Sequence, residues 1–239
     1  MAGNDQYTKL LLHLDNNVTD DSASSHSVTN NNVTFSSGTK KFGTHSASFN
    51  GSTADLVLSD SADWHFGSGN FTVDLWFYPT DLSSIENIIG QWPGASNRGW
   101  RIYNSAASKI WFSYSTDGTT NTEFNIENSD INMNDWNHLA WVRDGSTMRV
   151  FVDGTQITTH NCGSDSLNNS TADLYVGSLE NANYFNGYMD EIRISKGIAR
   201  WTSNFTPPTE PYCEDKLIDY YRVRRCFPID RIPRSVLVW

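Results

Sequence analysis

The 239-residue chain has no window in which apolar residues recur with the period of a helix. Its apolar and polar residues instead alternate over short stretches, as in strands that bury one face. Asp-Gly pairs that begin at Asp117, Asp144 and Asp153 mark turns between these stretches. The pattern predicts an all-β fold, built as an antiparallel two-sheet sandwich or jelly roll.

Positive charge is scarce, because 17 Lys and Arg residues stand against 27 Asp and Glu residues and the formal net charge is -10. Nucleic acids and anionic membranes attract proteins through basic surfaces, so we expect neither as a partner. The acidic surface expected of this chain suits neutral glycans and divalent cations better. The segment Met1 to Asp5 is polar, and we see neither a signal peptide nor a run that would insert into a membrane. Export stays open for a fragment of a longer protein.

Cysteine is rare as well. The three cysteines, Cys162, Cys213 and Cys226, leave an odd one and form no disulfide framework. Cys213 and Cys226 could pair across a short loop, but the expected fold does not depend on that bond. Their spacing also lacks the paired Cys-x-x-Cys pattern of a zinc site.

Short strands account for most of the chain. The clearest is Phe71 to Tyr78, where Phe71, Val73, Leu75 and Phe77 share one face and Thr72, Asp74, Trp76 and Tyr78 share the other. The pair Asn50-Gly51 predicts a hairpin turn between two further strands. The expected strands are Tyr7 to Asp15, Ser46 to Phe49, Leu56 to Leu58, Phe71 to Tyr78, Ile88 to Trp92, Gly99 to Tyr103, Lys109 to Ser115, His138 to Arg143, Met148 to Val152, Asp173 to Val176 and Tyr188 to Ile194.

The closing strand carries one misplaced charge. Ile192 and Ile194 alternate with Glu191 and Arg193, as in a strand with one face on a core. By the same alternation Asp190 lies on the isoleucine face, where a carboxylate is costly to bury unless it is paired, hydrogen-bonded or bound to a metal. Asp190 therefore either ties the strand down or holds a cation.

Composition changes abruptly near Tyr212. The segment from Cys213 to Trp239 holds six of the 17 basic residues and two of the three cysteines. We therefore divide the chain into a domain at 1–212 and a basic tail at 213–239. The tail is either flexible or non-native, or it anchors the domain to a larger assembly, since its aromatic and aliphatic residues are unfavourable in water.

Four blocks carry a family resemblance, in the order LLLHLD, KKFGTHSASFNGSTADLVLSDSADWHFGSGNFTVDLWFYP, NDWNHLAWVRDGSTMRVFVDG and YVGSLENANYFNGYMDEIRISKGIARWTSNFTPP. Together they cover about Tyr7 to Tyr212, and they resemble the laminin-G-like domain of the concanavalin A-like lectin/glucanase superfamily. The resemblance implies a jelly roll of two curved antiparallel sheets. Copies with the DEIRISKG ending resemble modules of bacterial surface proteins and phage structural proteins. Many such modules bind carbohydrate or mediate adhesion, often with calcium.

The predicted metal ligands are Asp15 and Asp190. Calcium prefers several oxygen ligands, which acidic side chains distant in sequence can supply. The resemblance implies this pair. In laminin-G-like and related sandwich domains, an acid that ends the first strand and the acid of the Asp-Glu pair lie near one another, and some members bind calcium there. The alternative is that Asp190 accepts hydrogen bonds while Asp15 caps a turn. The two interpretations stay open.

The predicted sugar site is a loop bracketed by tryptophans, because sugar recognition usually combines an aromatic platform with polar groups that fix hydroxyls. Its candidate residues are Trp92, Asn97, Arg98 and Trp100. Tyr184 belongs to a second polar loop with central aromatics. The alternative is that these aromatic side chains fill the sandwich.

Catalysis is not expected. Glucanases that resemble this family carry two carboxylates in an E-x-D-x-E or E-x-D-x-x-E run, and the chain has no such run. Glu123 and Glu127 share a strand face but lack the intervening acid. No Gly-x-Ser-x-Gly, His-Glu-x-x-His or phosphate-loop motif is present in the sequence.

The sequence therefore predicts a non-catalytic carbohydrate-binding or adhesion module of a bacterial or phage surface protein. We expect an extracellular, virion-surface or cell-surface location, a glycan or cell-surface ligand, and calcium as the cofactor. The alternative function is a structural domain of a virion fibre or surface assembly, with contacts to assembly partners through the tail.

Overall fold

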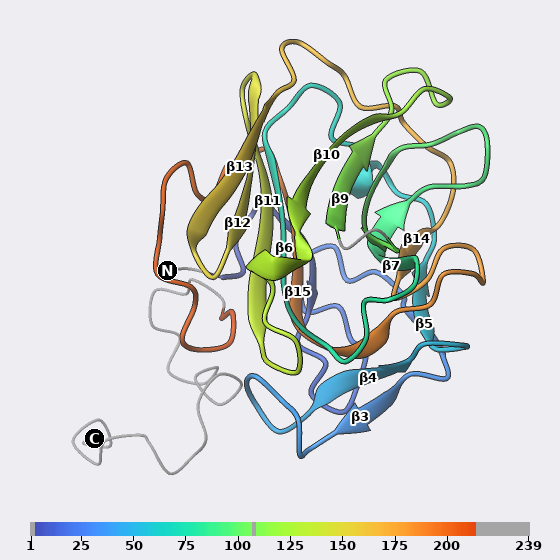
Figure 1. Ribbon diagram of the computed structural model, residues 1–239, viewed down its shortest axis with the longest axis vertical. Coiled ribbons are helices and arrows are strands. Elements are labelled where there is room, and N and C mark those ends of the chain that lie inside the picture. The colour runs from blue at the N-terminus through green and yellow to red at the C-terminus, as the bar shows by residue number, and fades with distance from the viewer. Residues whose placement is uncertain (1–2, 107–108, 214–239) are drawn as a thin grey trace.

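The computed structural model describes residues 3–106 and 109–213 and shows two antiparallel sheets packed face to face (Figure 1). The eight-stranded sheet has the order β13-β12-β11-β6-β15-β4-β3, and β1 also pairs with β15. Its strands are β1 (Thr8–Leu12), β3 (Thr34–Ser36), β4 (Ser46–Asn50), β6 (Phe71–Pro79), β11 (Asn137–Asp144), β12 (Thr147–Val152), β13 (Thr155–Asn161) and β15 (Asn186–Lys196).

The seven-stranded sheet has the order β10-β9-β8-β7-β14-β5-β2. Its strands are β2 (Thr29–Asn31), β5 (Asp55–Leu58), β7 (Glu86–Gln91), β8 (Trp100–Ser105), β9 (Lys109–Tyr114), β10 (Thr122–Glu127) and β14 (Leu174–Val176). Two single-turn 3-10 helices, at Ala62–Trp64 and Asn128–Asp130, are the helices of the described chain. The predicted all-β, antiparallel two-sheet sandwich is confirmed, and no helix within the described residues is long and apolar enough to cross a membrane.

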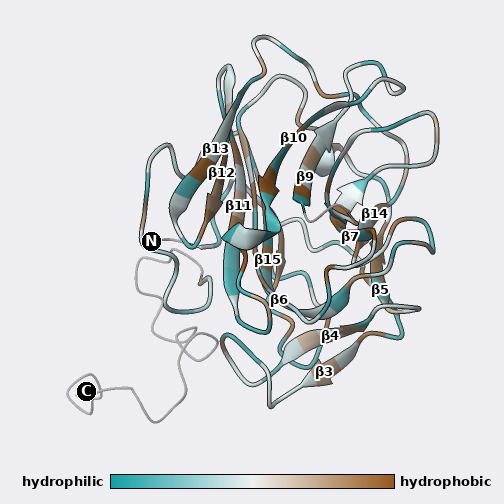
Figure 2. Ribbon diagram, viewed as in Figure 1, coloured by the Kyte–Doolittle hydropathy of each residue, from teal (hydrophilic) through white to brown (hydrophobic). Residues whose placement is uncertain are grey.

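The core lies between the sheets and follows the period-2 pattern of the strands. Trp141 of β11 is at its centre, with its ring 5.2 to 6.2 Å from the rings of Phe71, Trp100, Phe112 and Phe124. Figure 2 shows hydrophobic residues concentrated on the strands, whereas the loops are mostly pale or hydrophilic. The core face predicted for β6 is confirmed, since its four apolar residues are at most 1% exposed.

The predicted hairpin at Asn50-Gly51 is wrong. β4 pairs with β15 and β3 in one sheet, whereas β5 pairs with β14 and β2 in the other. The turn therefore carries the chain from one layer of the sandwich to the other. Sequence reasoning also missed β2, β3, β10 and β13, of which β2 and β13 are polar edge strands with mostly exposed residues.

β15 contains a bulge that changes the face of its acidic pair. Asp190 pairs with Trp76 of β6, but the next pair that the register keeps is Arg193 with Asp74, so β15 has one extra residue. Glu191 has a φ of 49°, in the left-handed region that bulges use. The alternation of side chains therefore shifts by one residue at Glu191.

The bulge corrects two expectations about this strand. Ile192 and Ile194 lie in the core, but Asp190 points to the outer face of the eight-stranded sheet rather than sharing their side. Glu191 and Arg193, which alternation places in solvent, are 2% and 1% exposed. Both are covered because the chain after β15 folds back over this face.

We call residues 197–213 the covering segment; it crosses the outer face of the eight-stranded sheet and ends near the N-terminus (Figure 1). The rings of Trp201 and Phe205 stack at 4.1 Å, and this pair packs on Ala140, Val142 and Phe151. Apolar burial of this kind contributes roughly 25 cal/mol per Å². The sandwich therefore has a second, smaller core on its outside.

A buried charge cluster fixes the end of the covering segment. Asp74 accepts hydrogen bonds from Nε and Nη2 of Arg193 at 3.0 and 3.2 Å and from the Tyr212 hydroxyl, and His138 Nε2 lies 3.6 Å away. Burial alone would raise the pKa of Asp74, but Arg193 and His138 lower it to about 2. Tyr212 is thus joined to the sheet by a charged partner.

The predicted basic tail lies almost wholly outside the described residues. Of the predicted tail at 213–239, the structure describes Cys213 alone, so the predicted pairing of Cys213 with Cys226 also lies outside them. Because Tyr212 is 5% exposed and bonded to the sheet, the described fold extends at least to that residue. The division at 212 stays a prediction.

Candidate functional site

Asn97 and Arg98 hold three loops together at one end of the seven-stranded sheet. Arg98 Nη1 donates to Thr119 O at 2.7 Å and to the side chain of Asn121 at 2.6 Å. The Asn97 amide exchanges hydrogen bonds with the side chain and backbone of Thr171. Asn97 has a φ of 63°, which asparagine tolerates better than most residues. Both predicted residues are partly exposed, but their polar groups serve loop structure.

The two bracketing tryptophans do not form a surface platform. Trp100 is 1% exposed in the core, and its indole N–H donates to Trp64 O at 3.0 Å. Trp100 therefore fills the sandwich, as in the alternative interpretation, and its role in sugar binding stays a prediction. Trp92 is 3% exposed, and the guanidinium carbons of Arg101 and Arg98 lie 4.8 and 5.4 Å from its ring centroid. Trp92 thus supports two cations and leaves little ring surface for a ligand.

Three adjacent strands present aromatic and charged side chains on the outer side of the seven-stranded sheet. Core residues on β8, β9 and β10 alternate with outward ones, and register aligns the outward ones across the strands. Tyr103 is opposite Trp111, which is opposite Asn125. We call this surface the open face; its residues are all partly exposed and are Arg101, Tyr103, Trp111, Glu123 and Asn125.

Arg101 is the electrostatic centre of the open face. Its guanidinium carbon lies 3.7 Å from the ring centroid of Tyr103, and its Nη2 is 3.9 Å from Glu123 Oε1. Burial lowers the pKa of Arg101 from its ordinary value, and Tyr103 and Glu123 oppose that change. Buried Nε has no hydrogen-bond partner. Such a cation, held between rings, can orient a ligand oxygen through its outer nitrogens.

Glu123 and Trp111 have fixed orientations beside that cation. Glu123 Oε1 accepts hydrogen bonds from Ser113 Oγ at 2.7 Å and from the Tyr103 hydroxyl at 3.4 Å. The Trp111 indole N–H donates to Ser105 Oγ at 3.1 Å. The open face therefore combines a pre-positioned indole ring with hydrogen-bond donors and acceptors.

Tyr184 lies in the loop between β14 and β15, apart from β8, β9 and β10. Arg101 is opposite Gly90 of β7, and Gly90 is opposite Tyr175 of β14. Burial raises the pKa of Tyr184, with a further contribution from Asp55, and Tyr184 in turn acts on the pKa of Tyr175. Of the predicted sugar residues, Trp92 lies against Arg101 of the open face, whereas Tyr184 belongs to a separate loop.

The sequence contains a signal for the open face that motif reasoning missed. Within β8, Arg101 and Tyr103 alternate with buried Trp100 and Ile102. Within β9, the single outward aromatic is Trp111, between buried Ile110 and Phe112. A search for aromatic residues on the polar side of adjacent strands would have found them; a search of loops could not.

Asp15, after β1, and Asp190, within β15, both contact the loop of residues 41–45, which brings them near one another as predicted. Asp190 Oδ2 accepts hydrogen bonds from the backbone N–H groups of Lys41 and Phe42 at 2.9 and 3.1 Å. Asp15 Oδ1 accepts from the backbone N–H groups of Thr44 and His45. These contacts match the hydrogen-bonded alternative.

The same two carboxylates do not form a ready calcium cage. Within the described part of the chain, no group of three or more His, Cys, Asp or Glu side chains is placed to hold a metal ion. Burial and the neighbouring charges of Glu191 and Asp15 raise the pKa of Asp190 to about 8. A carboxyl group that keeps its proton near neutral pH is a poor calcium ligand, so calcium at Asp15 and Asp190 stays a prediction.

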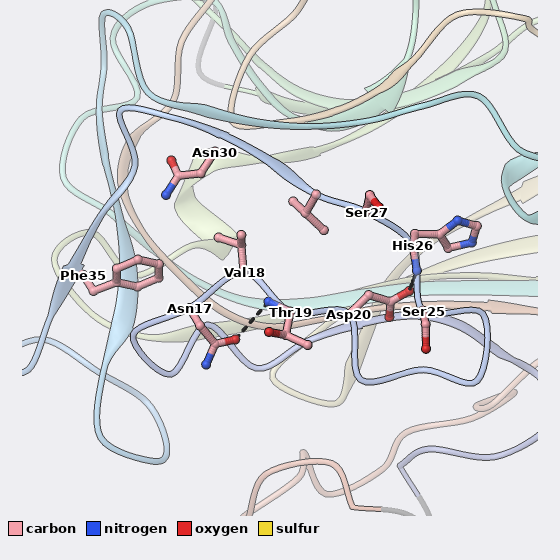
Figure 3. A pocket seen from close by; sticks show the side chains of 10 residues that line it. Asn17, Val18, Thr19, Asp20, Ser25, His26, Ser27, Asn30 and Phe35 are labelled. Carbon is pink, nitrogen blue, oxygen red and sulfur yellow. Dashed lines mark hydrogen bonds between the residues drawn. The ribbon is translucent and has the colours of Figure 1, made fainter.

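A hollow of about 620 Å³ lies between the loop after β1 and strands β2 and β3 (Figure 3). Val18 and Phe35 give it apolar walls. Asp20 lines it but already accepts hydrogen bonds from backbone N–H groups of Leu11, Ser22 and His26. The one carboxylate of the hollow is therefore committed to the backbone, and the hollow is the weaker candidate.

The carboxylates do not have the arrangement of a glycosidase pair. Glu127 lies four positions after Glu123 along β10, which corresponds to about 13 Å in a strand. That exceeds the roughly 5 to 9.5 Å between the carboxyl groups of glycosidases. Burial raises the pKa of Glu86 to about 8, but the nearby carboxylate of Asp81 is exposed and bonded to Ser83 N. Neither pair supports hydrolysis.

Comparison with protein families matches residues 50–200 to the concanavalin A-like lectin/glucanases superfamily. Comparison with curated protein sequences gives no match. The matched residues make up more than half of the chain and include most strands of both sheets.

Solved binding domains of bacterial toxins have the same fold. The binding domain of botulinum neurotoxin serotype G is 16% identical, with a TM-score of 0.64, over 80% of this chain and 48% of that chain. The ligand-binding domain of serotype D, in complex with N-acetylneuraminic acid, is 15% identical, with a TM-score of 0.65, over 81% and 48%. The binding domain of Paraclostridial Mosquitocidal Protein 1 is 14% identical, with a TM-score of 0.62, over 80% and 49%.

The chain spans about half the length of these solved structures. At this level of identity the likeness shows the fold. The N-acetylneuraminic acid in the serotype D complex is a ligand of that protein.

Proposed function

Because the chain belongs to the concanavalin A-like lectin/glucanase superfamily, we propose that it is a non-catalytic carbohydrate-binding module whose ligand lies on the open face. The observation that carries the proposal is the alignment of Arg101, Tyr103, Trp111 and Glu123 on the outer side of one sheet. On the other sheet, residues 197–213 cover part of the outer side.

The chemistry of the open face suits a neutral sugar. The Trp111 ring offers an apolar plane for the C–H groups of a pyranose ring. Arg101 donates hydrogen bonds and Glu123 accepts them, so together they fit the hydroxyl groups of one sugar residue. The net charge of -10 makes a strongly anionic glycan a less favourable partner.

We extend the proposal to location and partner. A module of this kind acts where glycans are displayed, so we place the protein at a cell or virion surface with a glycan or other cell-surface ligand. The toxin structures with this fold are themselves binding domains, which supports a binding role over a catalytic one. A calcium ion at Asp15 and Asp190 is the alternative to the hydrogen-bonded role of these carboxylates, and it is separate from the sugar contacts.

Trp111→Ala tests the proposal. Loss of an interface tryptophan typically costs about 2 kcal/mol, so we expect the affinity of the open face for a bound polysaccharide to fall about thirtyfold. Affinity electrophoresis in gels that contain dextran, laminarin, galactomannan or xyloglucan measures the loss. Tyr7→Ala removes a partly exposed aromatic residue elsewhere and serves as the control.

Two results would contradict the proposal. One is a wild-type protein that no gel of the series retards. The other is a Trp111→Ala protein that binds as tightly as wild type. Equal melting temperatures of wild type and variant show that a loss of binding is local.

A further inference from the structure

The covering segment leaves part of the eight-stranded sheet bare, and three aromatic residues meet there. Tyr188 of β15 is opposite Tyr78 of β6, and Trp136 lies immediately before β11, which pairs with β6. All three side chains are partly exposed. We call Tyr78, Trp136 and Tyr188 the aromatic corner.

The rings of the aromatic corner support one another. The Tyr78 ring centroid lies 5.6 Å from that of Trp136, at an interplanar angle of 67°. The same ring lies 5.6 Å from that of Tyr188, at 83°. Edge-to-face contacts of this kind are favourable and restrict ring rotation. The corner is thus a preformed surface of two differently oriented ring planes around a third.

Polar groups border the corner on two sides. Register continues the row from Tyr188 to Ser48 of β4 and then to Thr34 of β3, which adds two hydroxyl groups. On the neighbouring row, Lys41 Nζ lies 3.7 Å from the ring centroid of Trp76. Asp135, next to Trp136, is among the carboxylates that act on the pKa of Lys41. Both donors and acceptors therefore lie beside the rings.

The size of the aromatic corner and the charges that flank it indicate which kind of ligand it binds. A stable protein interface buries about 800 Å² on each partner, and three partly buried rings supply much less. Flanking charges of both signs favour neither a cation nor an anion. A neutral saccharide needs one ring plane and a few hydroxyl partners, which is what the corner provides.

We propose that the aromatic corner is a second saccharide-binding site, so that a single copy of the chain binds two glycan segments on opposite sheets. This inference rests on the proposed function for its ligand class, but its residues are separate from the open face. Because the two sheets pack back to back, one copy would crosslink glycan chains without forming an oligomer. The covering segment would leave this corner free while it packs on β11 and β12.

Trp136→Ala and Tyr188→Ala test the second site, with Trp111→Ala for the first and Tyr7→Ala as the control. The probe is whichever of dextran, laminarin, galactomannan or xyloglucan retards the wild-type protein. Isothermal titration with oligosaccharides of that polymer gives the stoichiometry, turbidity with the polymer gives crosslinking, and sedimentation gives the oligomeric state. Circular dichroism and melting temperature show that each variant is folded.

We expect wild-type protein to sediment as a monomer, bind two oligosaccharides and precipitate the polymer. Each corner variant, and separately Trp111→Ala, should bind one oligosaccharide and lose precipitation, while Tyr7→Ala behaves as wild type. Corner variants that keep the wild-type stoichiometry and precipitation would overturn the second site and leave the proposed function intact. A wild-type dimer that Trp136→Ala dissociates would overturn it in favour of a second copy. A wild type that binds none of the polymers would contradict the proposed function itself.

Discussion

The outer sides of the two sheets use charge in opposite ways. On the eight-stranded sheet, Asp74 and Arg193 are at most 1% exposed and bonded to each other beneath the covering segment. On the seven-stranded sheet, Arg101 and Glu123 lie 3.9 Å apart and are partly exposed. Asp74 and Arg193 bond to groups within the protein, whereas Arg101 and Glu123 keep hydrogen-bonding groups that a ligand can reach.

The difference teaches that burial and function can be separated on one scaffold. A buried ion pair loses much if one partner is removed, because the other is left as an uncompensated charge. An exposed pair contributes about 0 to 1 kcal/mol to folding. Variants on the covered face should therefore change stability, and variants on the open face should change binding.

The largest effect is expected from Asp74→Ala. It leaves Arg193 buried without its carboxylate, so the free energy of unfolding should fall by about 3 to 5 kcal/mol. Tyr212→Phe, which removes one hydrogen bond to the same carboxylate, should cost about 1.5 to 3 kcal/mol. Urea denaturation followed by tryptophan fluorescence measures both.

Glu123→Ala on the open face is the matched control for Asp74→Ala, with an expected loss below about 1 kcal/mol. Equal losses for the two variants would erase the distinction between the faces.

The next effect concerns pH and two buried aspartates on the same outer face. Asp190, with a pKa raised to about 8, binds its proton more tightly in the folded chain. Its contribution to stability is therefore complete below about pH 4 and is lost as pH rises to about 8. Asp74, with a pKa lowered to about 2, acts in the opposite sense: its contribution is present above about pH 4 and is lost as pH falls toward 2.

Asp190→Asn should flatten the decline of stability between pH 4 and 8 by up to about 1.4 kcal/mol per pH unit. Glu86→Gln is the comparison, because burial raises the pKa of Glu86 in the same direction. Melting temperatures across this range give the slopes. A slope that Asp190→Asn leaves unchanged would show that Asp190 is already ionised in the folded protein.

The smallest effect is expected from removal of calcium. The N–H groups of residues 41, 42, 44 and 45 already satisfy one oxygen each of Asp15 and Asp190, so chelation with EDTA should leave the melting temperature unchanged. Repeating the melt in millimolar calcium completes the test. A rise in melting temperature that Asp15→Asn abolishes would support the calcium site instead.

The fold was largely predictable because its determinants are local. Alternation identified the core face of β6, and four ordered sequence blocks indicated the jelly roll. The bulge at Glu191 was not predictable. Strict alternation places Asp190 on the core face and Arg193 in solvent, and nothing in the local sequence shows that one extra residue shifts this pattern. The hairpin predicted at Asn50-Gly51 was wrong for a similar reason, because a turn sequence does not say whether the next strand joins the same sheet.

The candidate site was less predictable than the fold. Trp100 and Trp111 are the same residue type on neighbouring strands, yet one is 1% exposed in the core and the other faces outward. Register decides which face an aromatic residue occupies, and register depends on pairing between distant segments. The loop motif around Trp92 could therefore not show that Trp100 is a core residue or that Trp111 faces outward, and the sugar site stays a prediction.

The indole N–H signals of the nine tryptophans provide the most direct test of the open face. In a two-dimensional ¹H–¹⁵N spectrum, Trp111 reports on the open face, Trp201 on the covering segment and Trp141 on the core. Titration with an oligosaccharide of a polymer that the protein binds should shift the Trp111 signal while those of Trp141 and Trp201 stay in place. Saturable binding that leaves the Trp111 signal unmoved would contradict the account.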